Sequence, residues 1–353
     1  MKIKKYEPLV SIVICTYNNK DIIAGCLKSI ADLTYNNFKC ILVDDHSTDG
    51  TYEYVKEKYP WVICVKKKEN SGIGTSRNIG IRKSKSKYIL FLDSDAELNM
   101  NFLNECVKLM ESDKNIGICG PKLAYILNSR IICSAGLGLL KICIGYDRGE
   151  GNNISKYATQ ERVLSVCGAA MFVRSKIFKS IGNFDETTSS YGCDDQDFCW
   201  RANIAGYKVL YNPKAIGYHG FHQTVKKMNS SKVIFHSTKA PIRMLIKNYS
   251  IKNLFKYLPL LFLFSVGDII LFGKSRTSKI KAWVWNITHI SDTLKEREHV
   301  QKTRKVDDKQ IDQYFDKNLM PWVKNIKRKP FKIVFINLIS SFGFLKEFFS
   351  FKL

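Results

Sequence analysis

The chain has 353 residues, 45% of them hydrophobic, and a formal net charge of +24. Its length suits one large α/β domain with an appendage, and its hydrophobic content is ordinary for a soluble globular protein. The 11 cysteines include no CxxC pair, which excludes a clustered zinc site, and the N-terminus shows no secretory signal. We therefore expect a reducing, cytoplasmic setting.

Apolar runs alternate with segments of helical spacing over the first hundred residues. This alternation predicts βαβ units and a mostly parallel sheet sandwiched by helices. The predicted strands are residues 10–17, 38–45, 61–67 and 88–95, and the predicted helices are residues 18–31, a segment from residue 51, and residues 70–83.

The fourth predicted strand ends in two carboxylates. Tyr88 to Leu92 are apolar or aromatic, and Asp93 and Asp95 follow one residue apart. Ligands of open α/β sheets bind beyond the carboxyl ends of the strands, and two acids there can hold a divalent cation that binds phosphate oxygens. The pattern favours a metal-bound diphosphate site, with an Asp-rich turn that caps the next helix as the alternative.

The pattern changes after residue 115 to shorter strands and turns, with further strands predicted near 162–175 and 209–222. Acidic residues recur at predicted strand ends or helix starts. Carboxylates are costly to cluster unless a cation or a proton transfer uses them, so these acids indicate chemistry. The groups are Asp44/Asp45, Asp93/Asp95, Asp185/Glu186 and Asp194/Asp195/Asp197.

The C-terminal third is strongly basic. Residues 224–353 carry 26 Lys and Arg against 9 Asp and Glu, a net charge of +17. Residues 258–272 form an apolar stretch interrupted by Pro259, Gly267 and Asp268, and a second apolar stretch covers 333–349. The first is shorter than the ~20 residues of a bilayer crossing. We expect an interfacial or re-entrant helix on an anionic membrane surface, with buried helices of a C-terminal subdomain as the alternative.

Seven segments, in order, resemble motifs of the family 2 glycosyltransferases. The resemblance covers roughly residues 9–222, and seven motifs in the right order are far more specific than any one of them. The segments are SIVICTYNN (11–19), LVDDHSTDGT (42–51), NSGIGTSRNIGI (70–81), FLDSDAEL (91–98), CGAAMFVRSKIF (167–178), GNFDE (182–186) and DDQDFCWRANIAG (194–206).

The resemblance implies an α/β fold of the GT-A type, with a Rossmann-like, mostly parallel sheet. It places a catalytic domain at residues 1–222, with a nucleotide-binding half (1–115) and an acceptor half (116–222). Residues 223–353 would form a basic, partly hydrophobic helical extension that associates with the membrane. The arrangement of this extension is similar to that of rhamnosyltransferase-like members.

The resemblance also implies roles for individual residues in binding the nucleotide sugar. Thr16 and Tyr17 would line the nucleotide pocket. Asp45 would contact the base, with Asp44 in support. Gly72 and Arg77 would lie near the nucleotide and its diphosphate.

Two further motifs imply the metal site and the catalytic base. Asp93-Ser94-Asp95 matches the DxD motif, in which Asp95 would be the direct ligand of Mg²⁺ or Mn²⁺ and Asp93 would assist. His219 would be a further metal ligand, with His222 as a neighbouring alternative. Asp195 matches the catalytic base, and Asp194 stands where Glu is usual. Asp197 and Arg201 complete the motif on the nucleotide-sugar side.

These inferences predict an inverting, metal-dependent glycosyltransferase, peripheral at the inner face of the cell membrane. It would move a hexosyl or deoxyhexosyl group from a nucleotide-sugar donor to a hydroxyl of a glycan or lipid-linked glycan. One alternative is a polyprenyl-phosphate glycosyl transferase, whose charged acceptor needs no strong base. The others are a non-catalytic nucleotide-sugar-binding module and a protein that binds nucleic acid or a membrane surface through its basic tail. We do not expect nucleic acid as a partner, because the tail contains no recognition motif.

Overall fold

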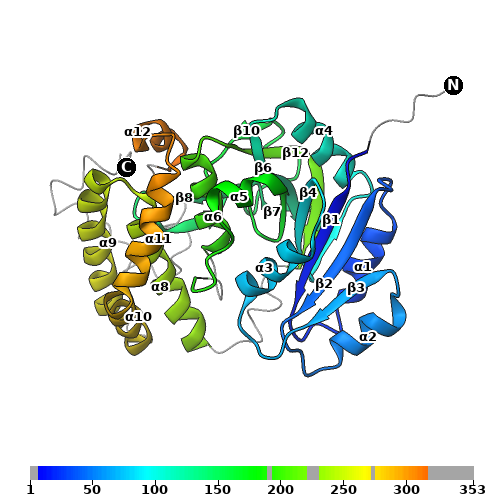
Figure 1. The fold of residues 1–353 in the computed structure, drawn as a ribbon, viewed down its shortest axis with the longest axis horizontal. Coiled ribbons are helices and arrows are strands. Elements are labelled where there is room, and N and C mark those ends of the chain that lie inside the picture. The colour runs from blue at the N-terminus through cyan, green and yellow to red at the C-terminus, as the bar shows by residue number, and fades with distance from the viewer. Residues whose placement is uncertain (1–6, 189–192, 221–229, 272–274, 317–353) are drawn as a thin grey trace.

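The computed structural model describes residues 7–188, 193–220, 230–271 and 275–316. His222 and the apolar stretch 333–349 lie outside these residues. A 10-stranded mixed sheet runs through the molecule in the order β10-β12-β6-β11-β4-β1-β2-β3, with β5 and β7 paired to β12 and β6. Helices cover both of its faces, and further helices stand beside it (Figure 1). The predicted α/β fold class is confirmed.

The first half of the sheet is parallel, as the alternating sequence pattern predicts. β2 pairs with β1 and β3, and β1 pairs with β4, all in parallel register. The carboxyl ends of these strands therefore meet at one edge of the sheet. The elements are β1 (Val10–Thr16), α1 (Ile23–Ala31), β2 (Phe38–Asp44), α2 (Thr51–Lys58), β3 (Val62–Lys66), α3 (Ile73–Lys83) and β4 (Tyr88–Asp93).

Strand β4 is buried on both faces, which explains its continuous apolar sequence. Tyr88, Leu90 and Leu92 join a core beneath α1 and α4, whereas Ile89 and Phe91 join a second core beneath α5 and α6. Alternation along the strand sends successive side chains to opposite faces. Two hydrophobic cores thus hold β4, the strand that ends at Asp93, in place.

The second half of the sheet is mixed. β11 lies antiparallel between β4 and β6, while β12 pairs in parallel with β6 and antiparallel with the short β5. The elements are β5 (Ala96–Leu98), α4 (Phe102–Ser112), β6 (Ile116–Tyr125), β7 (Asn128–Ser134), β8 (Leu137–Leu139), β9 (Gly145–Asp147), β10 (Glu161–Arg162), β11 (Ala170–Arg174), η1 (Ser175–Ile177), α5 (Phe178–Ile181), α6 (Asp194–Ile204) and β12 (Lys208–His219).

The C-terminal helices pack against α6 around a third hydrophobic core. Trp200 of α6 contacts the rings of Tyr249 and Phe315 edge-on, and Leu245 and Leu261 are buried in the same cluster. The helices stand together on the left of Figure 1. They are α8 (Ser230–Asn248), α9 (Ile251–Leu271), α10 (Arg276–Thr288), α11 (Ile290–Lys302), α12 (Asp308–Ile311) and η2 (Asp312–Tyr314).

The structure corrects the expectation that the apolar stretch at 258–272 is interrupted and short. Pro259, Gly267 and Asp268 do not break it, because α9 continues through all three over 21 residues. Asp268 pairs with Lys279 of α10, which neutralises its charge. The helix contains a 20-residue segment, Ile251–Ile270, that is long and apolar enough to cross a membrane, although 28% of its most apolar window is buried inside the protein.

A buried ion network joins α8 to the acid-rich segment that precedes and opens α6. The Lys247 ammonium lies 2.5 Å from Asp185 and 3.2 Å from Asp197, and Arg243 Nε lies 2.8 Å from Asp185. Asn248 donates a hydrogen bond to Asp197 at 3.0 Å. Burial opposes ionisation, but Lys247 and Arg201 outweigh it and lower the pKa of Asp197. The C-terminal helices therefore supply charges on which α6 depends.

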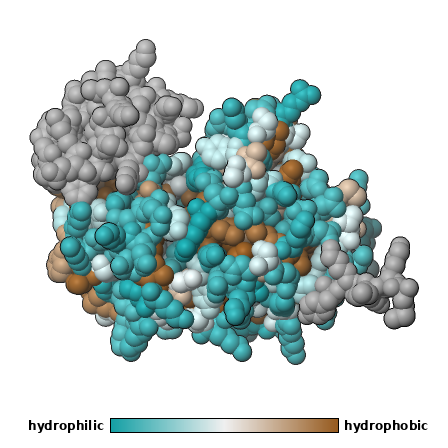
Figure 2. Space-filling model, turned by 90° about the horizontal axis from the view of Figure 1, so that it is seen from above, coloured by the Kyte–Doolittle hydropathy of each residue, from teal (hydrophilic) through white to brown (hydrophobic). Residues whose placement is uncertain are grey.

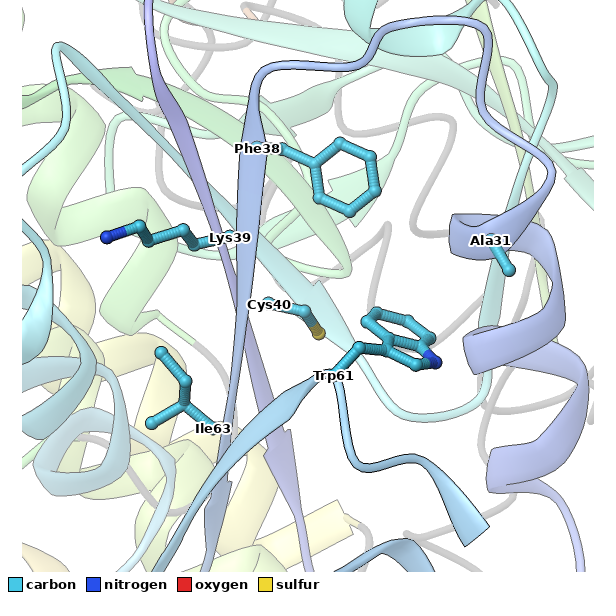
Figure 3. Close-up of a pocket in the computed structure, with 6 residues that line it drawn as sticks. All are labelled: Ala31, Phe38, Lys39, Cys40, Trp61 and Ile63. Carbon is cyan, nitrogen blue, oxygen red and sulfur yellow. The ribbon is translucent and has the colours of Figure 1, made fainter.

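An apolar depression lies at the opposite end of the strands from the acids (Figure 3). Phe38 begins β2 and Trp61 immediately precedes β3, so the depression is at the amino ends of these strands. It is therefore separate from the edge at which Asp44 and Asp93 end their strands. Its lining residues are Ala31, Phe38, Lys39, Cys40, Trp61 and Ile63.

Replacing Lys247 with Met should destabilise the protein by about 3 kcal/mol, because removing one partner of a buried ion pair leaves a carboxylate undercompensated. Lys239→Met is the matched control. Lys239 is equally buried on α8 but has no carboxylate within ion-pair distance among the described residues. Urea denaturation measures the free energy of unfolding of both variants. Equal losses for the two variants would show that the network contributes no more than packing.

Candidate functional site

Three strands and one helix bring the predicted acids to a single edge of the sheet. Asp44 and Asp93 are the last residues of β2 and β4, and both strands flank β1, which ends at Thr16. Helix α6 begins at Asp194, whose carboxylate pairs with Arg77 of α3. Acids separated by up to 150 residues in the sequence thus converge where ligands of open α/β sheets bind.

Asp93, Asp95 and His219 form a group able to hold a metal ion, which we name the metal-type group. Each offers one ligand atom, and these atoms all lie within 4.8 Å of one another. The pairing of β5 with β12 brings His219 opposite Ala96, so that its Nε2 lies 3.3 Å from Asp95 Oδ1. Burial opposes protonation, but the Asp95 carboxylate raises the pKa of His219 well above its usual value. A cation held by the three residues would displace this proton, because histidine coordinates a metal only as the neutral imidazole.

Arg77 joins the two groups of acids. Its guanidinium pairs with Asp194, donates to the carbonyl of Gly168 at 2.9 Å, and lies 3.5 Å from Asp93 Oδ1. The side chain is only 3% exposed. A buried guanidinium requires compensating carboxylates, and here it receives one from each group. The predicted site residues Arg77, Asp93 and Asp194 therefore belong to one cluster.

Asp195 is held beside this cluster by two backbone N–H groups. Gly168 N–H donates to Oδ2 at 2.8 Å, and Gln196 N–H donates to Oδ1 at 2.7 Å. Burial and the adjacent carboxylate of Asp194 nevertheless raise the pKa of Asp195 to about 7, against the opposing charge of Arg77. A carboxylate with this pKa can take up a proton near neutral pH, which is the property of a general base.

The ends of β1 and β2 carry two buried oxygens without a hydrogen-bond partner in the described part of the chain. They are Thr16 Oγ1 and Asp44 Oδ2, on residues that pair directly across the two strands. Asp44 Oδ1 is occupied by Ser47 N–H at 2.9 Å. Tyr17 follows Thr16 and is half-buried. The family resemblance predicts the nucleotide pocket at this end of the site.

Asp45 is occupied by the protein itself. Its Oδ1 accepts from Lys67 Nζ at 2.5 Å and from Ser71 N–H at 3.0 Å, and its Oδ2 accepts from Gly72 N–H at 2.9 Å. Gly72 has φ +91°, a conformation that favours glycine, and it caps α3. In this structure Asp45 therefore fixes the turn that begins α3 and positions Arg77.

Asp197 and Arg201 lie behind the site rather than in it. Asp197 is fully buried, and Arg201 Nε donates to it at 2.9 Å. Arg201 also donates to the carbonyls of Ile181 at 2.5 Å and Asn183 at 2.8 Å. The expected contact of these two residues with the nucleotide sugar is thus corrected. Their side chains are consumed in holding α6 against the preceding segment.

Several residues of the site received no role from the sequence. Gly168 belongs to a recognised segment, but only the fold shows that a Cβ there would lie 2.8 Å from Arg77 and 3.0 Å from Asp195. Asn19 donates to the predicted Ser94 at 2.8 Å. Lys67 neutralises Asp45. Gly168 and Asn19 could have been found from the sequence, because both lie within the segments that resemble the family. No sequence pattern pointed to Lys67 or Lys247.

Comparisons with known proteins agree with this arrangement. Residues 11–181 match the family model described as "Glycosyl transferase family 2". A glucosyltransferase of Escherichia coli, WfaP, is 37% identical over 107 residues, which cover 30% of this chain and 43% of the relative. An uncharacterised glycosyltransferase of Rickettsia prowazekii, RP339, is 30% identical over 190 residues, covering 53% and 57%. The chain thus spans about half the length of these relatives.

Solved structures show the same fold at low sequence identity. GalNAc-T7 has a TM-score of 0.57 at 17% identity, covering 72% of this chain and 50% of its own. Staphylococcus aureus TarS 1-349 has a TM-score of 0.53 at 20% identity, covering 77% and 79%. The mannosyltransferase PcManGT of Pyrobaculum calidifontis has a TM-score of 0.52 at 15% identity, covering 85% and 86%. Residues 11–181 therefore form a glycosyltransferase family 2 domain, and the chain has the GT-A fold.

Proposed function

We propose that this chain is an inverting, metal-dependent glycosyltransferase. It transfers a sugar from a nucleotide-diphosphate donor to a hydroxyl group of a glycan or lipid-linked glycan. The observation that carries the proposal is the cluster in which Arg77 connects the metal-type acid Asp93 to Asp194, with the raised-pKa carboxylate of Asp195 beside it. A site for a diphosphate and a site for proton removal therefore adjoin.

The names of similar proteins support this substrate class. WfaP is a UDP-Glc:alpha-D-GlcNAc-diphosphoundecaprenol beta-1,3-glucosyltransferase, and a similar protein of Bacillus spizizenii is a poly(ribitol-phosphate) beta-glucosyltransferase. The TarS structure contains UDP-GlcNAc. Acceptors in these names are a lipid-linked sugar and a polyol polymer. We propose the same general classes of donor and acceptor for this chain.

The proton transfer is assigned to Asp195. An acceptor hydroxyl is a poor nucleophile until a carboxylate within hydrogen-bond reach removes its proton. As the oxygen attacks the anomeric carbon, the bond to the diphosphate breaks, the proton moves to Asp195, and the nucleoside diphosphate leaves with the electron pair. A single displacement of this kind inverts the anomeric centre. Gly168 and Gln196 hold Asp195 in one orientation through their N–H groups.

The donor set of the metal-type group fits Mg²⁺ or Mn²⁺. Two carboxylates and one imidazole converge, and hard divalent cations prefer carboxylate oxygens together with substrate phosphates. Asp93, Asp95 and His219 would hold the ion. When bound, the ion supplies Lewis-acid neutralisation of the charge on the diphosphate. Arg77, fixed by Asp194, contributes a second positive charge at the same edge.

Asp195→Asn should lower sugar transfer roughly 10²–10⁴-fold while leaving nucleotide-sugar binding intact. For the wild type, kcat/KM should rise with pH through about 7, because only the ionised form of Asp195 accepts a proton. Product release from a panel of nucleotide sugars measures both effects, with the exposed Glu57→Gln as control. Full activity of Asp195→Asn on polyprenyl phosphate would instead favour the carrier-phosphate reaction.

Chelation should abolish transfer, and added Mn²⁺ should restore it, if the three ligands hold the ion. Titration calorimetry with Mn²⁺ should show binding to the wild-type protein and a strong loss in Asp95→Asn. Asp113→Asn, which removes an acid paired with Lys208 far from the site, is the control. Undiminished turnover in the presence of a chelator would contradict the metal dependence.

We further propose that the enzyme is a peripheral protein at the cytoplasmic face of the membrane. Phe255, Phe262 and Ile270 are 75%, 51% and 64% exposed along one side of α9. Ile280, Val284 and Ile287 extend an exposed stripe along α10, and the exposed Lys252, Lys256, Arg276 and Lys281 accompany these residues. Figure 2 shows hydrophobic surface at its left edge, the side on which α9 lies in Figure 1. Such a surface suits anionic lipid.

The double variant Phe255→Ser, Phe262→Ser should lose sedimentation with phosphatidylglycerol-containing vesicles, because it removes apolar area from the proposed lipid face. Leu127→Ser is the matched control, since Leu127 is 93% exposed on the loop between β6 and β7. Wild-type protein should sediment with these vesicles but not remain on a DNA column at physiological salt. Equal sedimentation of both variants would exclude α9 as the contact.

A further inference from the structure

Two oxygens next to the proposed base have no hydrogen-bond partner within residues 7–188, 193–220, 230–271 and 275–316. They are Oδ1 of Asp147 on β9 and Oε1 of Gln196 on α6, and both atoms are buried. Leaving a buried polar atom unpaired costs about 1–3 kcal/mol, so such atoms call for an explanation. Neither oxygen contributes to the metal-type group or to the proton transfer described above.

Strand β9 places these two oxygens on the same surface. A Cβ at Gly145 would overlap the amide of Gln196, so Gly145 leaves the room that this side chain occupies. Residues 145 and 147 are two apart on the strand and therefore face the same side, roughly 7 Å apart along it. Asp147 thus points to the side on which Gln196 lies.

This surface lies between the metal-type group and the proposed base. Burial raises the pKa of the Cys167 thiol, and the carboxylates of Asp147 and Asp195 raise it further, which places both acids near Cys167. On the other side, Cys133 Sγ lies 3.7 Å from His219 Nδ1 and is also within the field of Asp147. Gln196 directly follows Asp195 in α6. A molecule bound here would adjoin the reacting atoms.

Both unpaired atoms are hydrogen-bond acceptors, which defines the chemistry of the ligand. The ligand must present donors, and hydroxyl groups of a sugar do so, whereas an ionised phosphate offers only acceptors. A phosphate would also add negative charge beside Asp147, Asp195 and Asp93. A sugar ring carries several such hydroxyl groups and can therefore offer more than one donor at once.

We propose that Asp147 and Gln196 form an acceptor-sugar subsite that recognises a neutral glycosyl unit through its hydroxyl groups. This inference rests on the proposed glycosyltransferase function and extends it. It names the chemical class of the acceptor at the reacting end as an uncharged sugar, with any lipid or phosphate further away. Asp147 acts as a specificity-determining residue, because its carboxylate accepts from a hydroxyl adjacent to the one that reacts.

The test measures binding and turnover separately. Wild-type protein, Asp147→Asn and Gln196→Ala are titrated with methyl β-glucoside, methyl β-N-acetylglucosaminide and methyl α-rhamnoside, using saturation-transfer NMR in the presence of UDP and Mn²⁺. Release of nucleotide from UDP-sugars without an acceptor measures the donor half of the reaction. Glu150→Gln is the matched control, because Glu150 is a nearby exposed acid whose partner is Tyr125.

Wild-type protein should bind at least one glycoside, and Asp147→Asn should weaken that binding roughly tenfold or more while acceptor-free nucleotide release is unchanged. Glu150→Gln should behave as wild type. Equal glycoside affinity of wild type and Asp147→Asn overturns the subsite, as does the failure of wild type to bind any of the three. Glycoside binding that requires Asp147, without any transfer or nucleotide release, refutes the enzymatic function but leaves the subsite standing.

Discussion

The site depends on one buried guanidinium. Four aspartates at the edge of this sheet would repel one another and lose their charge if water alone compensated them. Arg77 prevents this by pairing with Asp194 and lying 3.5 Å from Asp93, while it also donates to the carbonyl of Gly168. Burial and the neighbouring carboxylate of Asp194 raise the pKa of Asp195 to about 7 against the charge of Arg77, and burial raises the pKa of Asp93 to about 6. One cation thus compensates carboxylates of both acid groups.

The position of Arg77 is itself the product of other buried charges. Asp45, paired with Lys67, fixes the turn at Gly72 from which α3 carries Arg77 into the site. On the opposite side, Asp197 anchors α6 to Lys247 of α8. We infer that a chain cut at residue 222 would lose Arg243, Lys247 and Asn248, leaving Arg201 as the remaining cation beside Asp197. The helices beyond the match to the family model therefore contribute to the precision of the site.

The sequence was sufficient to predict the elements whose patterns are local. Continuous apolar runs identified β1, β2 and β4, and the acids at their ends followed directly, because parallel strands align their carboxyl ends. The resemblance also suggested His219 as a metal ligand beside Asp93 and Asp95, and the ligand atoms of the three residues lie within 4.8 Å of one another. The antiparallel insertion of β11 between β4 and β6 had no local signal, because strand order depends on packing across the whole sheet.

Charges were harder to predict than strands. Asp197 and Arg201 looked like site residues because they stand next to Asp194 and Asp195, but helical geometry turns them away toward Lys247 and the carbonyl of Ile181. Likewise, Pro259, Gly267 and Asp268 suggested a broken helix, whereas packing in the third core and the partner Lys279 sustain α9. Sequence spacing reveals which groups are neighbours on a helix but not which distant partner neutralises them.

The two ends of the site have opposite chemical requirements, and this limits what can bind where. The end formed by Arg77 and the metal-type group concentrates positive charge once an ion is present, which suits a diphosphate. The end formed by Asp147 and Gln196 presents two unpaired acceptor oxygens, which suit hydroxyl donors. A charged acceptor phosphate would meet the wrong end. If a lipid diphosphate is part of the acceptor, we expect at least one neutral sugar to separate it from Asp195, and basic residues such as those of α8 to α10 to compensate its charge.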